Sequence, residues 1–183
     1  DSPVDNLLLA NLLSVEATRQ LQHIFPSDSP FWNHHLRHWA EYTQAVRLDK
    51  IRNRSGLAEF STTDLLHIGR KAALLKTYPV AVALCFGKEE QIISIEKMMD
   101  NFNTAIQINN DIQSIKNDIE TPHYTLPLVN AAVNAGFKVG THPTNDELLC
   151  SLALSRAVPD SHQIACNYYL NARNASVSLG IDD

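Results

Sequence analysis

The sequence predicts an all-α fold, a packed helical bundle that forms a single domain over residues 1–183. Apolar residues recur at intervals of three and four along nearly the whole chain, whereas the alternating pattern of a half-buried strand is scarce. Only 6 glycines and 8 prolines punctuate the chain, and no low-complexity linker or long repeat divides it. With 183 residues, 44% of them hydrophobic, it is long enough to build one core without disulfides or bound metals. About seven helices with short connections are expected.

The first half of the chain is expected to form three helices, at about residues 4–25, 31–51 and 62–86. Pro26 ends the first, and the Ser-Pro pair at 29–30 precedes the second, where proline suits the first helical turn. Ser61 and Asp64 have the spacing of a capping box, with aspartate in place of the usual glutamate, and this pattern predicts the start of the third helix. Pro79 is expected to break or kink that helix.

The second half begins with the longest uninterrupted helical pattern of the sequence, at about residues 88–121. Three shorter helices are expected after it, at about residues 126–135, 145–156 and 161–179. Thr144 is suited to cap the helix predicted at residues 145–156, because its hydroxyl can accept a hydrogen bond from a free N–H group of the first turn. Pro159 and Asp160 are expected to precede the last helix.

The composition excludes several classes of partner. Lys and Arg number 15 against 20 Asp and Glu, so the formal net charge is −5 and the chain lacks the basic surface that binds nucleic acid or anionic lipid. The longest mostly apolar stretch, residues 72–86, is interrupted by a lysine and a proline and is shorter than the roughly 20 residues that span a bilayer. We therefore expect neither a nucleic-acid partner nor a membrane span.

Three cysteines, Cys85, Cys150 and Cys166, are too few and too far apart for a disulfide framework or a zinc knuckle. Such sparse cysteine usage is typical of a reducing compartment, so a cytoplasmic location with buried free thiols is expected. His34 and His38 are four residues apart and could hold a transition metal on a helix. Because no further ligand at catalytic spacing completes that site, we expect a partly exposed histidine face instead.

Polar side chains recur every three or four residues in the second half of the longest predicted helix. They are Asn103, Gln107, Asn110, Asp111, Ser114 and Asp118. Asn110, Ser114 and Asp118 drift only about 40° per step, so their oxygens form a ladder about 12 Å long. Amide, hydroxyl and carboxylate oxygens are hard donors that hold Mg²⁺ and leave positions open for water and a phosphate-bearing substrate. The same stripe is also compatible with the solvated face of an amphipathic helix.

The stripe resembles a motif of a known enzyme superfamily. Residues 110–118, NDIQSIKND, resemble the second metal-binding motif of class I terpene synthases, Asn-Asp-x-x-Ser-x-x-x-acid. Asp118 stands where that family usually has Glu, and Lys116 lies one place before its common basic residue. Residues 107–114, QINNDIQS, and 125–128, TLPL, are similar to the second Asp-rich helix of polyprenyl diphosphate synthases and the segment that follows it.

A third stretch of the chain agrees with the same superfamily. Residues 70–74, RKAAL, resemble the Lys-Thr-Ala turn by which prenyltransferases hold diphosphate, with Ala72 in place of Thr. The resemblance covers about residues 65–133. It implies a class I isoprenoid synthase fold and a Mg²⁺-dependent enzyme that ionises an allylic prenyl diphosphate, either as a terpene synthase, which is a lyase, or as a trans-prenyltransferase.

The resemblance also assigns roles to individual residues. It implies that Asn110, Ser114 and Asp118 bind Mg²⁺ and that Asp111 supports this site or replaces one of its ligands. It also implies that the diphosphate of the substrate is bound by Arg70, Lys71, Gln107 and Lys116.

One part of the superfamily pattern is missing. Both families usually carry a first motif, Asp-Asp-x-x-Asp or close to it, on an earlier helix, and this sequence contains none. We therefore expect the chain to be the C-terminal portion of a longer isoprenoid synthase domain, without its N-terminal helices, and a homodimer is one assembly to consider. Two alternatives remain open: a non-catalytic partner or regulatory subunit of an isoprenoid synthase, and an unrelated helical interaction module.

Overall fold

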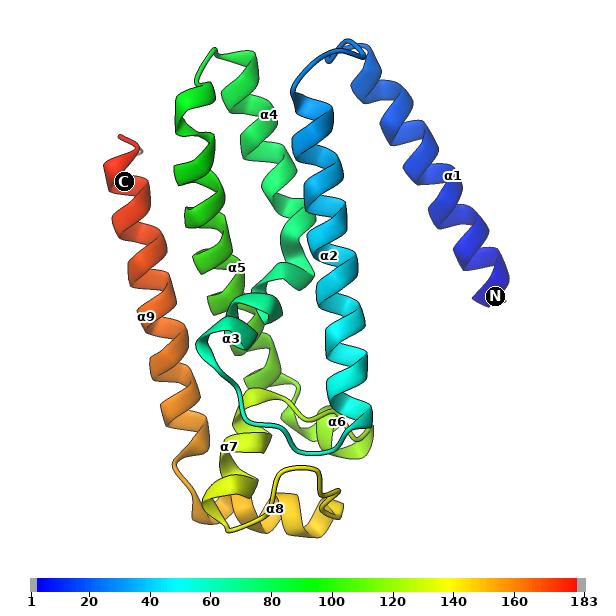
Figure 1. The fold of residues 1–183 in the computed structure, drawn as a ribbon. Helices are drawn as coiled ribbons and strands as arrows, with labels where there is room; N and C mark the ends of the chain where they lie inside the picture. Colours follow the sequence, from blue (N-terminus) through cyan, green and yellow to red (C-terminus); the bar gives the residue numbers. More distant parts are fainter. Residues whose placement is uncertain (1–2, 181–183) are drawn as a thin grey trace.

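The computed structural model describes residues 3–180, apart from the side chains at positions 3 and 7, and every regular element in this part of the chain is a helix (Figure 1). It forms nine α helices and two 3₁₀ helices. They are α1 (Pro3–Gln22), α2 (Phe31–Arg54), α3 (Thr62–Gly69), η1 (Arg70–Lys76), α4 (Thr77–Cys85), η2 (Glu89–Gln91), α5 (Ile92–Gln113), α6 (Ile115–Glu120), α7 (Leu126–Asn134), α8 (Asn145–Leu154) and α9 (Ala157–Ser178). The all-α prediction is thus confirmed for the described residues.

Helix α5 is the centre of the bundle. It packs along α9 on one side and against α3 and η1 on the other, while α2 packs against η1 and α4 (Figure 1). Helices α7 and α8 close the lower end in this view, over a core that includes Leu57, Tyr124, Leu128, Val129 and Leu148. Helix α1 slants away from α2 and has no extensive contact with another described element.

The predicted helix starts are largely confirmed. Ser61 and Asp64 form a complete capping box at the start of α3, and Thr144 forms another with Glu147 at the start of α8. Helix α9 begins earlier than predicted, at Ala157, so its proline lies in the first turn, where the absent N–H group would have no partner in any case.

The helix predicted for residues 62–86 is divided into α3, η1 and α4, and its bend is not at Pro79. Pro79 occupies the first turn of α4, where proline is tolerated. The bend lies at Ala72, whose φ of −111° and ψ of 19° are not helical. The prediction of a kink at the proline was therefore wrong, because proline breaks a helix only where the chain needs its N–H group.

The long pattern at residues 88–121 is also interrupted. A short 3₁₀ helix, η2, precedes α5, and α5 ends at Gln113. Ser114, with φ of −92° and ψ of 4°, separates α5 from α6. The amide of Ser114 still donates to the carbonyl of Asn110 at 2.9 Å, so the chain changes direction without losing that hydrogen bond.

Two partly buried ion clusters hold α2 against its neighbours. Glu96 of α5 accepts hydrogen bonds from His38 Nε2 at 3.0 Å and His34 Nδ1 at 3.2 Å, and it pairs with Arg37. Lys76, whose side chain is 2% exposed, pairs with Glu41 and with Asp100. The expected exposed histidine face was therefore wrong for His38, which is fully buried, because its partner comes from a helix that is distant in sequence.

The cysteines are placed differently from the prediction. Cys85 and Cys150 are exposed and Cys166 is half-buried, and none of them forms a disulfide among the described residues. Hydrophobic packing of the nearby helices uses larger aliphatic side chains, such as Val80 and Leu148.

The apolar stretch at residues 72–86 is shared by η1 and α4 and contains the buried, ion-paired Lys76. Within residues 3–180, no helix combines the length and the apolar character needed to cross a bilayer.

Candidate functional site

Several of the residues that carry the sequence motif meet where η1 faces the C-terminal half of α5. Gly69, the last residue of α3, makes this close approach possible. A Cβ atom at Gly69 would lie 2.2 Å from Thr104 Oγ1 and 2.8 Å from the Thr104 backbone nitrogen. Only glycine allows this contact between α3 and α5, and the contact sets the position of the two basic residues that follow, Arg70 and Lys71.

At the bend, the backbone carbonyl of Ala72 accepts a hydrogen bond from a buried side-chain amide. Asn103 Nδ2 donates to the Ala72 carbonyl oxygen at 3.2 Å, and Asn103 is 2% exposed. A carbonyl freed from a regular helix needs such a partner when it is buried. Asn103, one member of the polar stripe, therefore stabilises the bend that presents Lys71.

A continuous chain of polar contacts starts at Lys71. Lys71 Nζ lies 3.4 Å from Asp49 Oδ1 of α2, and Asp49 Oδ2 lies 3.3 Å from His123 Nε2. The other ring nitrogen of His123, Nδ1, lies 3.5 Å from Asp118 Oδ1. Ser114 Oγ donates to Asp118 Oδ2 at 2.6 Å. Four separate segments of the chain thus contribute to one network of charged and hydroxyl groups.

Asp111 lies beside this network and is only 4% exposed. Burial raises its pKa from 3.8 to about 6, although the charge of Lys71 and a hydrogen bond from Gln107 both act to lower it. Gln107 Nε2 donates to Asp111 Oδ1 at 3.4 Å, and the negative charge of Asp118 raises the pKa of Asp111 further. Burial therefore outweighs the stabilisation of the Asp111 carboxylate by Lys71 and Gln107.

This pKa predicts a pH-dependent effect of Asp111→Asn on stability in metal-free buffer. Since the pKa of Asp111 is raised from 3.8 to about 6 on folding, its contribution to stability is present below about pH 4 and is lost as the pH rises through 6. The neutral amide avoids that loss, so we expect Asp111→Asn to increase the free energy of unfolding by about 2 kcal/mol at about pH 8 and by little at about pH 4. Urea unfolding at the two pH values measures the difference, and an equal effect at both would contradict the prediction.

Two residues of the network were not predicted from the sequence. Burial opposes ionisation of Asp49, but the hydrogen bond with His123 and the charge of Lys71 lower its pKa below the usual value. The hydrogen bond with Asp49 in turn raises the pKa of His123 above its usual value. Asp49 lies 22 residues before Lys71 and 74 before His123, so no local spacing indicates the contact. The one available signal was the position of His123 between the stripe and the TLPL segment.

The predicted site residues do not all meet. Lys71, Gln107, Asp111, Ser114 and Asp118 gather in this region. The side chains of Asn110 and Lys116 are exposed and form no hydrogen bond with other described residues, and Arg70 lines a different cleft. Because Asn110 and Asp111 are neighbours on a helix, they point about 100° apart, and only Asp111 faces Lys71.

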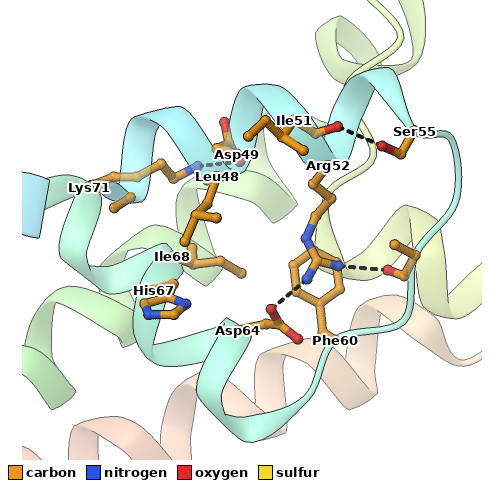
Figure 2. Close-up of a pocket in the computed structure, with 12 residues that line it drawn as sticks. Leu48, Asp49, Ile51, Arg52, Ser55, Phe60, Asp64, His67, Ile68 and Lys71 are labelled. Atoms are coloured by element: carbon orange, nitrogen blue, oxygen red, sulfur yellow. Dashed lines mark hydrogen bonds and ion pairs between the residues drawn. The ribbon is translucent and has the colours of Figure 1, made fainter. Parts of the chain in front are cut away.

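A cleft of about 280 Å³ opens beside Lys71, between α2 and α3 (Figure 2). Lys71 and Asp49 lie at one end of it. At the other end Arg52 pairs with Asp64 at 2.7 Å, donates to the Ala58 carbonyl at 2.8 Å and lies 4.0 Å from the centre of the Phe60 ring. The wall between the two ends is apolar and is formed by Leu48, Ile51 and Ile68. The cleft therefore combines an ion pair at each end with an apolar wall.

The donor atoms at the site suit Mg²⁺ in their chemistry. The carboxylates of Asp111 and Asp118 and the hydroxyl of Ser114 are hard oxygen donors on one side of α5 and α6, and a bound cation would offset the cost of ionising the buried Asp111 carboxyl. Within the described ranges, no three His, Cys, Asp or Glu side chains are grouped so as to hold a metal ion. A magnesium site here would thus need the serine oxygen, water and phosphate oxygens in addition to the two carboxylates.

Comparison with known proteins adds no assignment to this geometry. No protein-family model, no curated protein and no solved structure matches the chain. The site itself and the motif resemblance of residues 65–133 are therefore what indicate a function for the chain.

Proposed function

We propose that the chain binds the Mg²⁺ complex of an allylic prenyl diphosphate beside Lys71, Asp111, Ser114 and Asp118, as part of an enzyme that ionises this substrate. One observation carries the proposal. Lys71 on η1 and the acidic side of α5 and α6 are about 40 residues apart, yet Lys71 lies close enough to Asp111 to lower its pKa. These are the residues that the motif resemblance assigns to a common diphosphate and metal site.

Lys71 has the properties of a diphosphate ligand. Its ammonium group is a compact charge on a flexible stem, and its side chain is 16% exposed, so it can turn from Asp49 toward an incoming anion. Asp49 remains paired with His123 when Lys71 moves, because His123 contacts the other oxygen of Asp49. Gln107 can donate a second hydrogen bond from the neighbouring turn of α5.

The carboxylates supply the opposite half of the site. Asp111, Ser114 and Asp118 would hold Mg²⁺ through oxygen atoms, and His123 keeps Asp118 oriented by contacting its second oxygen. Bound Mg²⁺ would stabilise the charge that develops on a departing diphosphate. The apolar wall of Leu48, Ile51 and Ile68 lies beside Lys71 and offers a surface for a prenyl chain that excludes water.

The experiment that tests the proposal has two stages. Calorimetric titration of the full chain with inorganic diphosphate, with and without Mg²⁺, measures binding. Incubation with geranyl, farnesyl and geranylgeranyl diphosphates then measures diphosphate release, and gas chromatography identifies hydrocarbon or alcohol products. Longer diphosphates formed only with isopentenyl diphosphate would indicate a prenyltransferase. Binding without turnover would favour a non-catalytic subunit over an enzyme. Absence of Mg²⁺-dependent diphosphate binding would exclude both of these functions.

Asn110→Ala and Asp111→Asn distinguish two neighbouring residues as Mg²⁺ ligands. Because Asp111 faces Lys71 whereas Asn110 is exposed, we expect Asp111→Asn to weaken Mg²⁺-dependent diphosphate binding about 10- to 100-fold and Asn110→Ala to have a much smaller effect. Calorimetry with inorganic diphosphate measures both. The reverse ranking would support a ladder of Asn110, Ser114 and Asp118, with Asp111 in a supporting role. Folding is an internal control, since Asp111→Asn is expected to stabilise the chain.

A further inference from the structure

Arg70 and Lys71 are adjacent in sequence but line two different clefts. Lys71 faces the cleft between α2 and α3, whereas Arg70 lines a second cleft of about 550 Å³, to which α2, α3, α5 and α9 contribute. The two clefts have no lining residue in common. The bend that follows Arg70, in η1, separates the two side chains, so the two adjacent basic residues face different clefts.

Most charges around the second cleft already neutralise one another. Glu96 pairs with Arg37, and Lys76 pairs with both Glu41 and Asp100. These five side chains belong to the ion clusters that hold α2 against its neighbours. They form a rigid polar wall, because Lys76 is almost fully buried and cannot leave its two partners without a large loss of free energy.

Two basic side chains of this cleft remain without a carboxylate. Neither Arg70 nor Lys97 forms an ion pair in the part of the chain that the structure describes. Four basic side chains and three carboxylates line the cleft, which leaves one net positive charge on its wall. The Nε atom of Arg70 is fully buried and has no hydrogen-bond acceptor among the described residues. A buried, unpaired guanidinium N–H group is unfavourable, and a bound acceptor would relieve this cost.

We infer that this cleft binds a small organic carboxylate, whose anionic group is held by Arg70. The guanidinium group presents parallel N–H donors that match the two oxygens of a carboxylate. A monoanion balances the single net charge of the wall, whereas a phosphate dianion exceeds it. Leu66 and Ile93 provide apolar contact for the body of the molecule, and Asn171 adds a polar group from α9.

Tyr168 of α9 supports this assignment independently. It lines the same cleft, and burial raises its pKa, so its hydroxyl remains protonated and able to donate a hydrogen bond at neutral pH. Helix α9 thus contributes hydrogen-bonding groups to the cleft that Arg70 of η1 also lines. The carboxylate site is separate from the proposed diphosphate site, and neither depends on the other.

The test uses 4-fluorobenzoate as the probe and fluorine NMR line broadening of the probe as the measurement, with the full chain. We expect saturable binding of 4-fluorobenzoate and none of 4-fluorobenzamide, its neutral counterpart. Arg70→Gln is expected to weaken binding at least about tenfold, since it removes a charge-assisted hydrogen bond. Arg70→Lys keeps the positive charge but loses the parallel N–H donors of the guanidinium group. Its affinity for 4-fluorobenzoate should lie between those of the unsubstituted chain and Arg70→Gln. Thermal unfolding of each variant checks that it is folded.

Lys71→Gln is the matched control, one residue away in the other cleft. It should leave 4-fluorobenzoate binding unchanged and reduce binding of inorganic diphosphate, while Arg70→Gln should do the opposite. Equal binding of 4-fluorobenzoate to Arg70→Gln and the unsubstituted chain, or no binding to either, would overturn the inference. So would loss of carboxylate binding in Lys71→Gln, or tighter binding of 4-fluorophenyl phosphate than of 4-fluorobenzoate. Diphosphate binding could still hold in each of these cases, so the two proposals fail separately.

Discussion

Replacing Gly69 with alanine is expected to lower the free energy of unfolding by about 3 kcal/mol, the upper part of the usual range for overpacking a tight contact. The new Cβ atom would lie 2.2 Å from Thr104 Oγ1 and 2.9 Å from Thr104 Cα. Thr104 cannot move aside easily, because it is fully buried and its hydroxyl donates to the Asp100 carbonyl at 2.7 Å. Helices α3 and α5 would have to separate, which disturbs packing along both.

Gly87→Ala is the control for this effect. Gly87 has a φ of +63°, which disfavours alanine, but a Cβ atom there would meet nothing within 4 Å. It therefore reports the backbone strain alone, about 1 kcal/mol. Urea unfolding measures both variants. Equal destabilisation by the two substitutions would contradict the close approach of α3 to α5.

Lys71→Gln is expected to weaken Mg²⁺-dependent binding of inorganic diphosphate about 10- to 100-fold. Hydrogen bonds to charged groups contribute about 1.5–3 kcal/mol, and every 1.4 kcal/mol is a tenfold change in affinity. Glutamine keeps a hydrogen-bond donor but removes the charge that lowers the pKa of Asp111. More of the Asp111 carboxyl is then protonated near neutral pH, which adds to the loss of Mg²⁺ affinity.

The control for Lys71→Gln is Arg70→Gln, which removes one positive charge from the adjacent residue and so has the same effect on net charge. Calorimetry with inorganic diphosphate at fixed Mg²⁺ and fixed ionic strength compares the two. A similar loss in both variants would mean that the net charge of this region, rather than the position of Lys71, governs binding. Retention of full affinity in Lys71→Gln would remove Lys71 from the proposed site.

The helices were largely predictable because their signals are local. A capping box needs only Ser61 and Asp64, three residues apart, and apolar periodicity follows from 3.6 residues per turn. The same local logic failed at Pro79, since the bend lies at Ala72 instead, where Asn103 of another helix donates to the freed carbonyl. A proline can be recognised in a sequence, but a contact between two helices cannot.

The candidate site was predictable in part. The motif resemblance grouped Lys71 with Asp111, Ser114 and Asp118, and the structure places these residues near one another. It also placed Arg70 with Lys71, and those two line separate clefts. The direction in which each side chain of a bent segment points depends on backbone angles that the residue types do not specify.

By itself, the sequence determined the all-α class, most helix starts and the polar stripe on α5, because each follows from residues less than about one or two turns apart. The tertiary structure alone decided that Asp49 and His123 join the site, that the buried His38 pairs with Glu96, and that Arg70 and Lys71 line different clefts. These contacts join segments between about 20 and 75 residues apart, and they form only when the apolar faces of several helices pack together. Local propensity acts within a turn of helix, whereas the charge environment of Asp111 depends on which distant helices surround it.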